Sequence, residues 1–247
     1  MNKISIIIPI LNEADNIGNL LQHLLDTSSI ENISEIIVVD GGSTDGSQEI
    51  ANSFVSSSEV ERSIKVLNYA RPDILLINSP KGRAKQMNLG AKNVRGNILY
   101  FLHADSYPPK YFDYLIIDEV RNGNEAGCFK MKFDDNHWWL QLASWLTQFS
   151  WRACRGGDQS QFITKILFKD VGGYNEDYII YEDNILINEL FKRKQFVVIQ
   201  EWLTTSARMY RRFGIWKLQY HFWAIYVKRW YGVSAEELNR YYKKNIA

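Results

Sequence analysis

The chain has few cysteines, no long apolar run and almost no net charge. Its 247 residues include only Cys128 and Cys154, too few for a disulfide framework, so we expect a reducing compartment. Ser5 and Pro9 break the apolar start too early for a secretory signal, and no window approaches the ~18 apolar residues of a spanning helix. The net charge of +1 excludes bulk attraction to nucleic acid. These absences predict a cytoplasmic protein, with peripheral contact at the inner face of the plasma membrane as the furthest alternative.

A glycine-rich turn is also missing after the first apolar run, Ile4–Ile10. Leu11, Asn12 and Glu13 follow that run, and the first glycine is Gly18. Dehydrogenases and methyltransferases need such a turn to bring the backbone close to a cofactor, so both classes are disfavoured. Sugar-nucleotide pyrophosphorylases are disfavoured in the same way.

Apolar runs and amphipathic stretches alternate over the first hundred residues. We expect buried strands at Ile4–Ile10, ended by Pro9, and at 36–39, 64–67, 74–77 and 97–102. Helices are expected over 17–25, capped by Asn12, and over 81–94, while SSSEVERS (56–63) reads as a solvated loop. This order predicts a single α/β domain whose central sheet is mostly parallel, Rossmann-like and flanked by helices. We divide it into a nucleotide-binding half (1–105), an acceptor-binding half (106–203) and a C-terminal aromatic and basic helical segment (204–247).

Carboxylates stand where expected strands end. Asp105 follows the strand that closes with Leu102, where open α/β sheets bind ligands, and it suits a magnesium or manganese ion shared with phosphates. Its alternative role is to cap the helix after Pro108 and Pro109. Glu13 and Asp40 follow the first two strands and can contact a nucleoside or cap a helix. Arg83 opens the helix at 81–94, where it can bind a diphosphate or lie on a solvated face.

Glu182 and Asp183 begin another expected helix. Taken alone, two acids at a helix N-terminus are explained by capping and by the helix dipole. A carboxylate in that position is also able to take a proton from an acceptor hydroxyl.

Aromatic residues crowd into the second half of the chain. Trp138, Trp145 and Phe149 share helical spacing, and we expect mixed use of these rings, slightly more for packing than as an acceptor platform. Further on, aromatic residues recur at steps of three and four with basic residues beside them; they are Phe213, Trp216, Tyr220, Trp223 and Trp230. Such a helix lies in a bilayer interface or covers the sheet. Ser234 and Glu237 predict a capping box for a last helix.

Taken in order, these segments resemble the family-two glycosyltransferases, inverting enzymes of the GT-A fold. The matching motifs are 5–9 with Asn12-Glu13, 38–45, His103-Ala104-Asp105 and Glu182-Asp183. The match looks closest to a bacterial subgroup called selenodomain-associated transferases, on residues 82–88, 157–159, 205–208 and 232–234.

The resemblance implies metal-assisted transfer of a sugar from a nucleoside-diphosphate sugar to an acceptor, lipid-linked as one option, with inversion. It makes Asp183 the catalytic base with Glu182 beside it. Asp105, with His103, looks like the ligand of Mn²⁺ or Mg²⁺. The implied donor-binding residues are Pro9, Asn12, Glu13, Asp40, Arg83, Ala104 and Arg208. The implied acceptor-side residues are Asp158, Gln159 and Trp139. Arg211 is expected either to close over the diphosphate or to form a surface ion pair.

Two positions depart from the family pattern. Gly41 stands where a second acid usually follows Asp40, and His103 stands where the metal motif usually has its first acid. Histidine suits manganese better than magnesium. The rival hypothesis is a non-catalytic protein that binds a nucleotide sugar, a lipid or a membrane surface.

Overall fold

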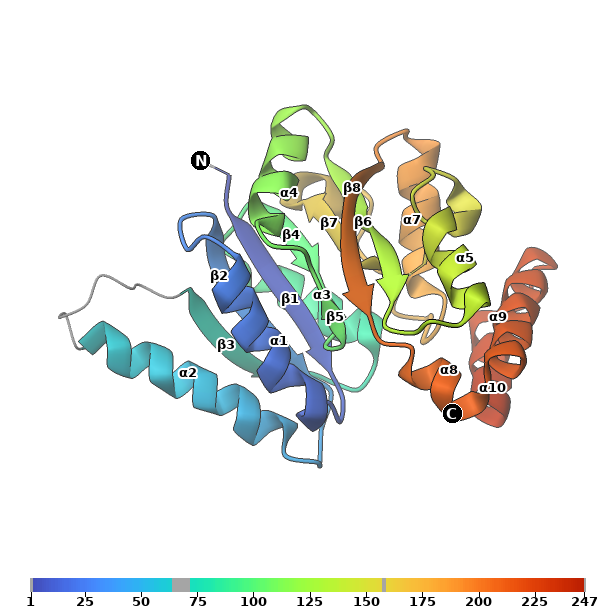
Figure 1. Ribbon diagram of the computed structural model, residues 1–247, viewed down its shortest axis with the longest axis horizontal. Coiled ribbons are helices and arrows are strands. Elements are labelled where there is room, and N and C mark those ends of the chain that lie inside the picture. Colours follow the sequence, from blue (N-terminus) through green and yellow to red (C-terminus); the bar gives the residue numbers. More distant parts are fainter. Residues whose placement is uncertain (1, 64–71, 157–158, 247) are drawn as a thin grey trace.

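One eight-stranded sheet organises the molecule (Figure 1). The computed structural model describes residues 2–63, 72–156 and 159–246. Its strands are β1 (Ile4–Ile10), β2 (Ile33–Asp40), β3 (Asp73–Asn78), β4 (Ile98–Phe101), β5 (Ser106–Tyr107), β6 (Ala126–Phe133), β7 (Gln161–Thr164) and β8 (Val197–Thr205). They lie in the order β3-β2-β1-β4-β7-β6-β8-β5, and β7 and β5 pair antiparallel with their neighbours. The mostly parallel α/β sheet predicted from the sequence is confirmed.

Helices cover both faces of this sheet. One face packs against α1 (Ala14–Thr27), α2 (Ser47–Ser63) and α4 (Phe112–Arg121), and the other against α3 (Arg83–Lys92), α6 (Lys165–Asp170) and α7 (Glu182–Lys192). Ile17, Leu20, Leu21 and Leu24 are fully buried, so α1 presents the single apolar face that its spacing predicts. The helix α5 (Trp138–Leu146) lies along β6, where Ser144 and Thr147 bond the strand's free backbone. A 3₁₀ turn, η1 (Arg152–Cys154), follows it.

The C-terminal helices form a small core of their own at one end of the molecule (Figure 1). They are α8 (Arg208–Phe213), α9 (Ile215–Trp230) and α10 (Ala235–Asn245), around Leu218, Ile225 and Leu238. Glu237 N donates to Ser234 Oγ at 3.3 Å, as the capping box predicts. Because α9 packs on α8 and α10 beyond the sheet, the alternative that it covers the sheet is wrong. None of the described helices is both long and apolar enough to cross a membrane.

Several local predictions need correction. Residues 56–63 continue α2 instead of forming a loop, because the apolar residues Ile50, Ala51 and Phe54 in its first half already anchor the helix to the core. Pro9 lies within β1 and does not end it. The pairing of β1 with β4 ends at Ile7, opposite Phe101, before Pro9 is reached. The missing N–H of Pro9 therefore costs no hydrogen bond between these strands. The strand expected at 64–67 lies outside the described residues.

The packing of α3 against β1 gives a stability prediction. A Cβ added to Gly90 would lie 2.5 Å from Ile7 Cγ2, whereas one added to Gly18 in α1 would lie 3.2 Å from Ile50 Cγ2. Alanine favours a helix over glycine by about 1 kcal/mol, but the clash at position 90 costs about 1–3 kcal/mol. We expect urea denaturation to show that Gly90→Ala lowers the free energy of unfolding, while the matched Gly18→Ala changes it by less than about 1 kcal/mol. Equal effects would contradict close packing at Gly90.

Candidate active site

The pairing of β5 with β8 brings the C-terminal segment onto the loop that carries Asp105. Ser106 pairs with Thr205, and Ser206 N donates to the Asp105 carbonyl at 3.2 Å. Arg208 follows directly at the start of α8. This backbone pairing explains why a residue from the end of the chain reaches the end of β4.

Arg208 bridges two carboxylates that come from different strand ends. Its Nε lies 3.1 Å from Asp105 Oδ2, and its Nη1 and Nη2 donate to Glu13 at 2.7 and 2.5 Å. Both carboxylate side chains are only 15% exposed, so the pairing is strong. Three residues predicted for donor and metal binding therefore lie together.

His103 lies between this group and a second one. Burial, followed by the positive charges of Arg83 and Arg208, lowers the pKa of His103 from 6.5 to about 3. The half-buried imidazole is therefore neutral near pH 7, which is the form that binds metal ions. It lines a water-sized cavity together with Asp183 and Tyr174.

Arg83 holds the two acids at the start of α7. Its Nε contacts Glu182 Oε1, and its Nη2 donates to Asp183 Oδ2 at 2.9 Å. The N-cap residue of α7, Tyr181, has a left-handed backbone and makes no side-chain cap bond. The sequence alone favoured helix capping for these two acids, and the structure adds that both carboxylates pair with Arg83.

Burial makes Glu182 a weaker acid than an ordinary glutamate, with a raised pKa. It is fully buried, and its Oε2 has no hydrogen-bond partner among the described residues. Burial raises the pKa of Glu182 from 4.5 to about 7; Arg83 opposes this rise and the Asp183 charge adds to it. Glu182, next to the predicted base, is therefore about half protonated near pH 7. Burial and these two acids also raise the pKa of Tyr174.

The helix α3 fixes Arg83 through polar side chains as well as through its apolar face. Gln86 Nε2 donates to Ile10 O and to Val39 O, both at 2.7 Å, and so ties α3 to the carboxyl ends of β1 and β2. Asn88 exchanges hydrogen bonds with the backbone of Tyr174 at 2.8 and 3.0 Å. Gln86 and Asn88 belong to the 82–88 motif of the sequence. Their role in fixing α3 could not be predicted, because it depends on how α3 packs on the strand ends.

The side chains of Asp40 and Asn12 both bond to residues of the segment that follows β2. Asp40 is fully buried and accepts from Gly42 N at 2.9 Å and Gln48 Nε2 at 2.6 Å. Burial alone would raise its pKa, but hydrogen bonds from Ser43, Gly42 and Gln48 outweigh burial and lower it. Asn12 does not cap α1: Glu13 is the N-cap residue, and Asn12 Oδ1 accepts from Thr44 N at 2.9 Å. Their contacts with a nucleoside stay predictions.

The remaining predicted donor residues lie at the same sheet edge. Ala104 is buried beside Asp105, and Pro9 is partly exposed near the end of β1. Arg211 forms the surface ion pair that was one of its alternatives, 2.9 Å from Asp134.

The acceptor-side residues are scattered. Gln159 is buried, and its amide bonds Cys154 O at 2.6 Å, which gives it a structural role. Trp139 lies between α5 and α9, where its Nε1 donates to Gln219 at 3.1 Å. Asp158 lies outside the described residues. Trp138 and Trp145 are 59% and 52% exposed, so neither ring is part of the buried core, although each contacts a neighbouring ring, Trp216 and Phe149 respectively.

Sequence reasoning missed a wide groove. It has a volume of about 510 Å³ between α5 and the ends of β6 and β8, and is lined by Trp145, Trp202 and Asp134 among others. Aromatic rings beside carboxylates are a lining that suits sugars. Only the aromatic content of this region signalled it in the sequence.

The residues present fit a divalent ion only in part. Asp105 offers a carboxylate and His103 a neutral imidazole, but no group of three or more His, Cys, Asp or Glu that could hold a metal occurs within the described ranges. Divalent ions often bind few protein ligands and complete their shell with substrate phosphates. A divalent ion fits this site if a bound diphosphate supplies further ligands. The ion would then contact the Asp105 carboxylate, which pairs with Arg208.

The mostly parallel sheet, with arginine–carboxylate groups at its open edge, defines a GT-A fold built around a polar ligand site. Residues 5–184 match the model of glycosyl transferase family 2, and the chain belongs to this family. It is 33% identical over 105 residues to the glycosyltransferase AglE of Haloferax volcanii, which covers 42% of this chain and 31% of AglE. It is 26% identical over 224 residues to the succinoglycan biosynthesis protein ExoA of Rhizobium meliloti, which covers 83% and 61%. The chain thus spans less than two thirds of each.

Solved structures share the fold. TarS of S. aureus in complex with UDP superimposes with a TM-score of 0.62 at 16% identity, covering 83% of this chain and 60% of that one. A mannosyltransferase of Pyrobaculum calidifontis in complex with GDP-Man and Mn²⁺ gives 0.63 at 16% identity, covering 91% and 60%.

Proposed function

We propose that this protein transfers a sugar from a nucleoside-diphosphate sugar to an acceptor hydroxyl with inversion, assisted by a divalent cation. The observation that carries the proposal is the pair of arginine–carboxylate groups on either side of His103: Arg208 with Asp105 and Glu13, and Arg83 with Glu182 and Asp183. Family membership and the neighbours solved with UDP and with GDP-Man and Mn²⁺ support it.

Asp183 serves as the base in this proposal. Its carboxylate accepts the proton of the acceptor hydroxyl while that oxygen bonds to the anomeric carbon. The bond from the anomeric carbon to the diphosphate oxygen breaks, and the diphosphate leaves with the electron pair on the opposite face. Arg83 positions the base, and Arg208 lies where it can neutralise the leaving group once Asp105 no longer holds it.

Asp105 and His103 would hold the cation in this proposal, Mn²⁺ or Mg²⁺, with phosphate oxygens of the donor completing its shell. When bound, the cation supplies positive charge to the departing diphosphate. The nitrogen ligand favours Mn²⁺ over Mg²⁺. Arg208 Nε lies 3.1 Å from Asp105 Oδ2, so a cation held by Asp105 would compete with Arg208, and in this proposal metal binding and donor binding are coupled.

A thermal-shift experiment tests the site. We expect Mn²⁺ together with UDP or GDP, at a hundred times the dissociation constant, to raise Tm by about 5–10 °C, and Mn²⁺ alone to raise it little. Asp105→Ala should lose most of the combined shift. Asp134→Ala is the matched control, because Asp134 is the carboxylate that pairs with Arg211 of the same helix, α8. This variant should keep the combined shift. No shift with a full set of nucleoside diphosphates would favour the rival, non-catalytic lipid-binding or membrane-surface protein.

We also propose membership of the selenodomain-associated subgroup and a cytoplasmic location at the inner face of the plasma membrane. The subgroup is supported by residues 82–88, which supply Arg83, Gln86 and Asn88, and by 205–208, which supply Arg208. The location is supported by the exposed aromatic surface described next.

A further inference from the structure

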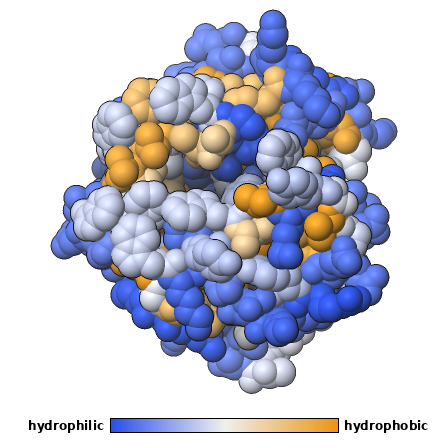
Figure 2. Space-filling view, turned by 90° about the vertical axis from the view of Figure 1, so that its right-hand side faces the viewer, coloured by the Kyte–Doolittle hydropathy of each residue, from blue (hydrophilic) through white to orange (hydrophobic). Residues whose placement is uncertain are grey.

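The helices α5 and α9 expose an unusual number of large aromatic side chains. Figure 2 looks at the end of the molecule that carries α9, where pale side chains, of the intermediate hydropathy of Trp and Tyr, gather around a hollow. On α9, the side chains of a row at steps of four and three are 49–82% exposed: Trp216 (52%), Tyr220 (63%), Trp223 (49%), Val227 (50%) and Trp230 (82%). These steps place the row on one side of the helix, opposite its buried residues Leu218 and Ile225.

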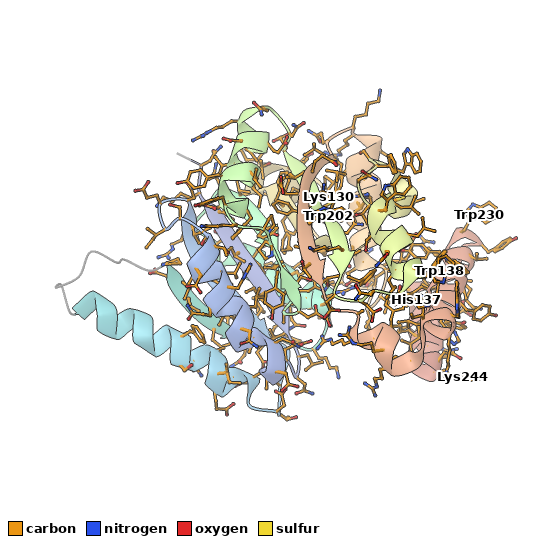
Figure 3. All side chains as sticks on the ribbon, viewed as in Figure 1. Lys130, His137, Trp138, Trp202, Trp230 and Lys244 are labelled. Atoms are coloured by element: carbon orange, nitrogen blue, oxygen red, sulfur yellow. The ribbon has the colours of Figure 1, made fainter. Side chains whose placement is uncertain are left out.

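The aromatic side chains of α5 extend this row. Trp138 and Trp139 contact Trp216 with ring centroids 5.7 and 5.4 Å apart, and Trp139 also contacts Trp223 at 5.8 Å. In Figure 3, Trp138 lies where α5 meets α9, and Trp230 points away from the far end of α9 into open space. We use the name aromatic surface for the α9 row together with Trp138 and Trp139.

Positive charge accompanies the aromatic surface. Between Glu201 and Glu236 the chain has no acidic residue and six Lys or Arg. Arg208 pairs with Glu13 of the active site and Arg211 pairs with Asp134 at the surface, but within the described residues no carboxylate pairs with Lys217 or Lys228. These two lysines are three helical turns apart and follow one flank of the row. Lys244 on α10 adds charge at the same end of the molecule (Figure 3).

We propose that the aromatic surface docks this protein onto an anionic phospholipid bilayer. Tryptophan and tyrosine favour the membrane interface, because their rings leave water while their polar atoms stay near headgroups. Flanking lysines are attracted to anionic lipids. A symmetric dimer through this face would bring the same lysines of both copies together, and the like charges oppose it.

Docking would place the catalytic carboxylates next to the bilayer. Tyr226 on α9 packs against Tyr181, with centroids 5.3 Å apart, and its hydroxyl accepts from Asn184 Nδ2 at 3.4 Å. Tyr181 and Asn184 flank Glu182 and Asp183 in the sequence. This step rests on the proposed function, and it names the acceptor class as a hydroxyl carried by a lipid.

Vesicle co-sedimentation without donor or metal tests the docking independently of catalysis. The whole chain should bind vesicles of phosphatidylcholine and phosphatidylglycerol in equal parts, bind pure phosphatidylcholine at least tenfold more weakly, and lose affinity with salt. Trp230→Ser/Tyr231→Ser, which removes two highly exposed rings with few contacts to lose, should bind about tenfold more weakly. Lys217→Glu/Lys228→Glu should lose the preference for anionic vesicles.

Matched controls separate docking from general effects. Tyr114→Ser removes an exposed ring on α4, and Lys92→Glu/Arg121→Glu makes the same change in net charge away from α9. Both should bind vesicles like the wild type, and circular dichroism should show all variants folded. Docking is overturned if the wild type stays in the supernatant, if the surface variants sediment as well as the controls, or if sedimentation velocity shows a dimer that these substitutions dissolve. It is equally overturned if the chain instead binds poly(U) through these residues.

Discussion

Asp183→Asn should reduce the rate of sugar transfer by about 10²–10⁴-fold while leaving donor binding nearly unchanged. The range is what a general base contributes, and an amide cannot accept the acceptor's proton. Asn keeps the shape of Asp and an oxygen that can still accept from Arg83 Nη2, which lies 2.9 Å from Asp183 Oδ2. The loss should therefore fall on kcat, with donor affinity measured by thermal shift in the presence of Mn²⁺ and the nucleoside diphosphate.

The neighbouring acid provides the control for this result. Glu182→Gln removes the other carboxylate on Arg83, but Glu182 is fully buried and less accessible to an acceptor. We expect it to retain at least a tenth of the transfer rate. If Glu182→Gln is the inactive variant and Asp183→Asn is active, the base is Glu182. If both transfer at wild-type rates, the base lies elsewhere.

The sequence predicted the part of the fold that depends on local pattern. The apolar runs around Ile6, Val38 and Leu99 become buried strands because each is long enough to cross the sheet and is apolar on both faces. Residues 56–63 were missed because their polar composition describes a solvated surface equally well as helix or loop. The helix there is set by apolar contacts made earlier in α2, which a local window does not include.

The site was predicted as a set of residues but not as pairs. Asp105 and Arg208 are separated by about a hundred residues, and only the β5–β8 pairing joins them, through Ser106 and Thr205. Arg83 looked like a diphosphate ligand because it opens a helix, yet it holds Glu182 and Asp183. The exposure of Trp138 was missed because helical spacing shows which residues share a face, not whether another element covers that face.

Arg83→Met should both stop sugar transfer and change the pH dependence of stability. Arg83 is the cation on two acids that are 0% and 7% exposed. Removing one partner of a buried ion pair costs about 3–5 kcal/mol, and since Arg83 is 35% exposed we expect a loss of about 2–3 kcal/mol at pH 8. Transfer should fall at least about 10²-fold, because Asp183 loses the group that positions it.

The direction of the pH effect follows from Glu182. Its pKa in the folded protein is about 7, above its ordinary 4.5, so between these values the folded state binds more protons than the unfolded state. This group therefore makes the free energy of unfolding fall as pH rises from about 4.5 to about 7, with no further change above. Without Arg83 the pKa of Glu182 rises further, so in Arg83→Met the fall continues to higher pH.

Urea denaturation between pH 5 and pH 9 measures this difference. Arg83→Met should already be less stable than the wild type at pH 5 by about 1 kcal/mol, because Asp183 loses its contact with Arg83. Above pH 7 the difference should grow by up to about 1.4 kcal/mol for each pH unit, because Glu182 then ionises in the wild type first. Arg83→Lys keeps the charge but loses the two-pronged geometry, so its stability profile should follow the wild type while its transfer rate falls. Glu182→Gln should remove this part of the pH dependence. A constant difference between Arg83→Met and wild type at every pH would mean that Arg83 acts on stability through packing alone, and that the buried carboxylates do not depend on its charge.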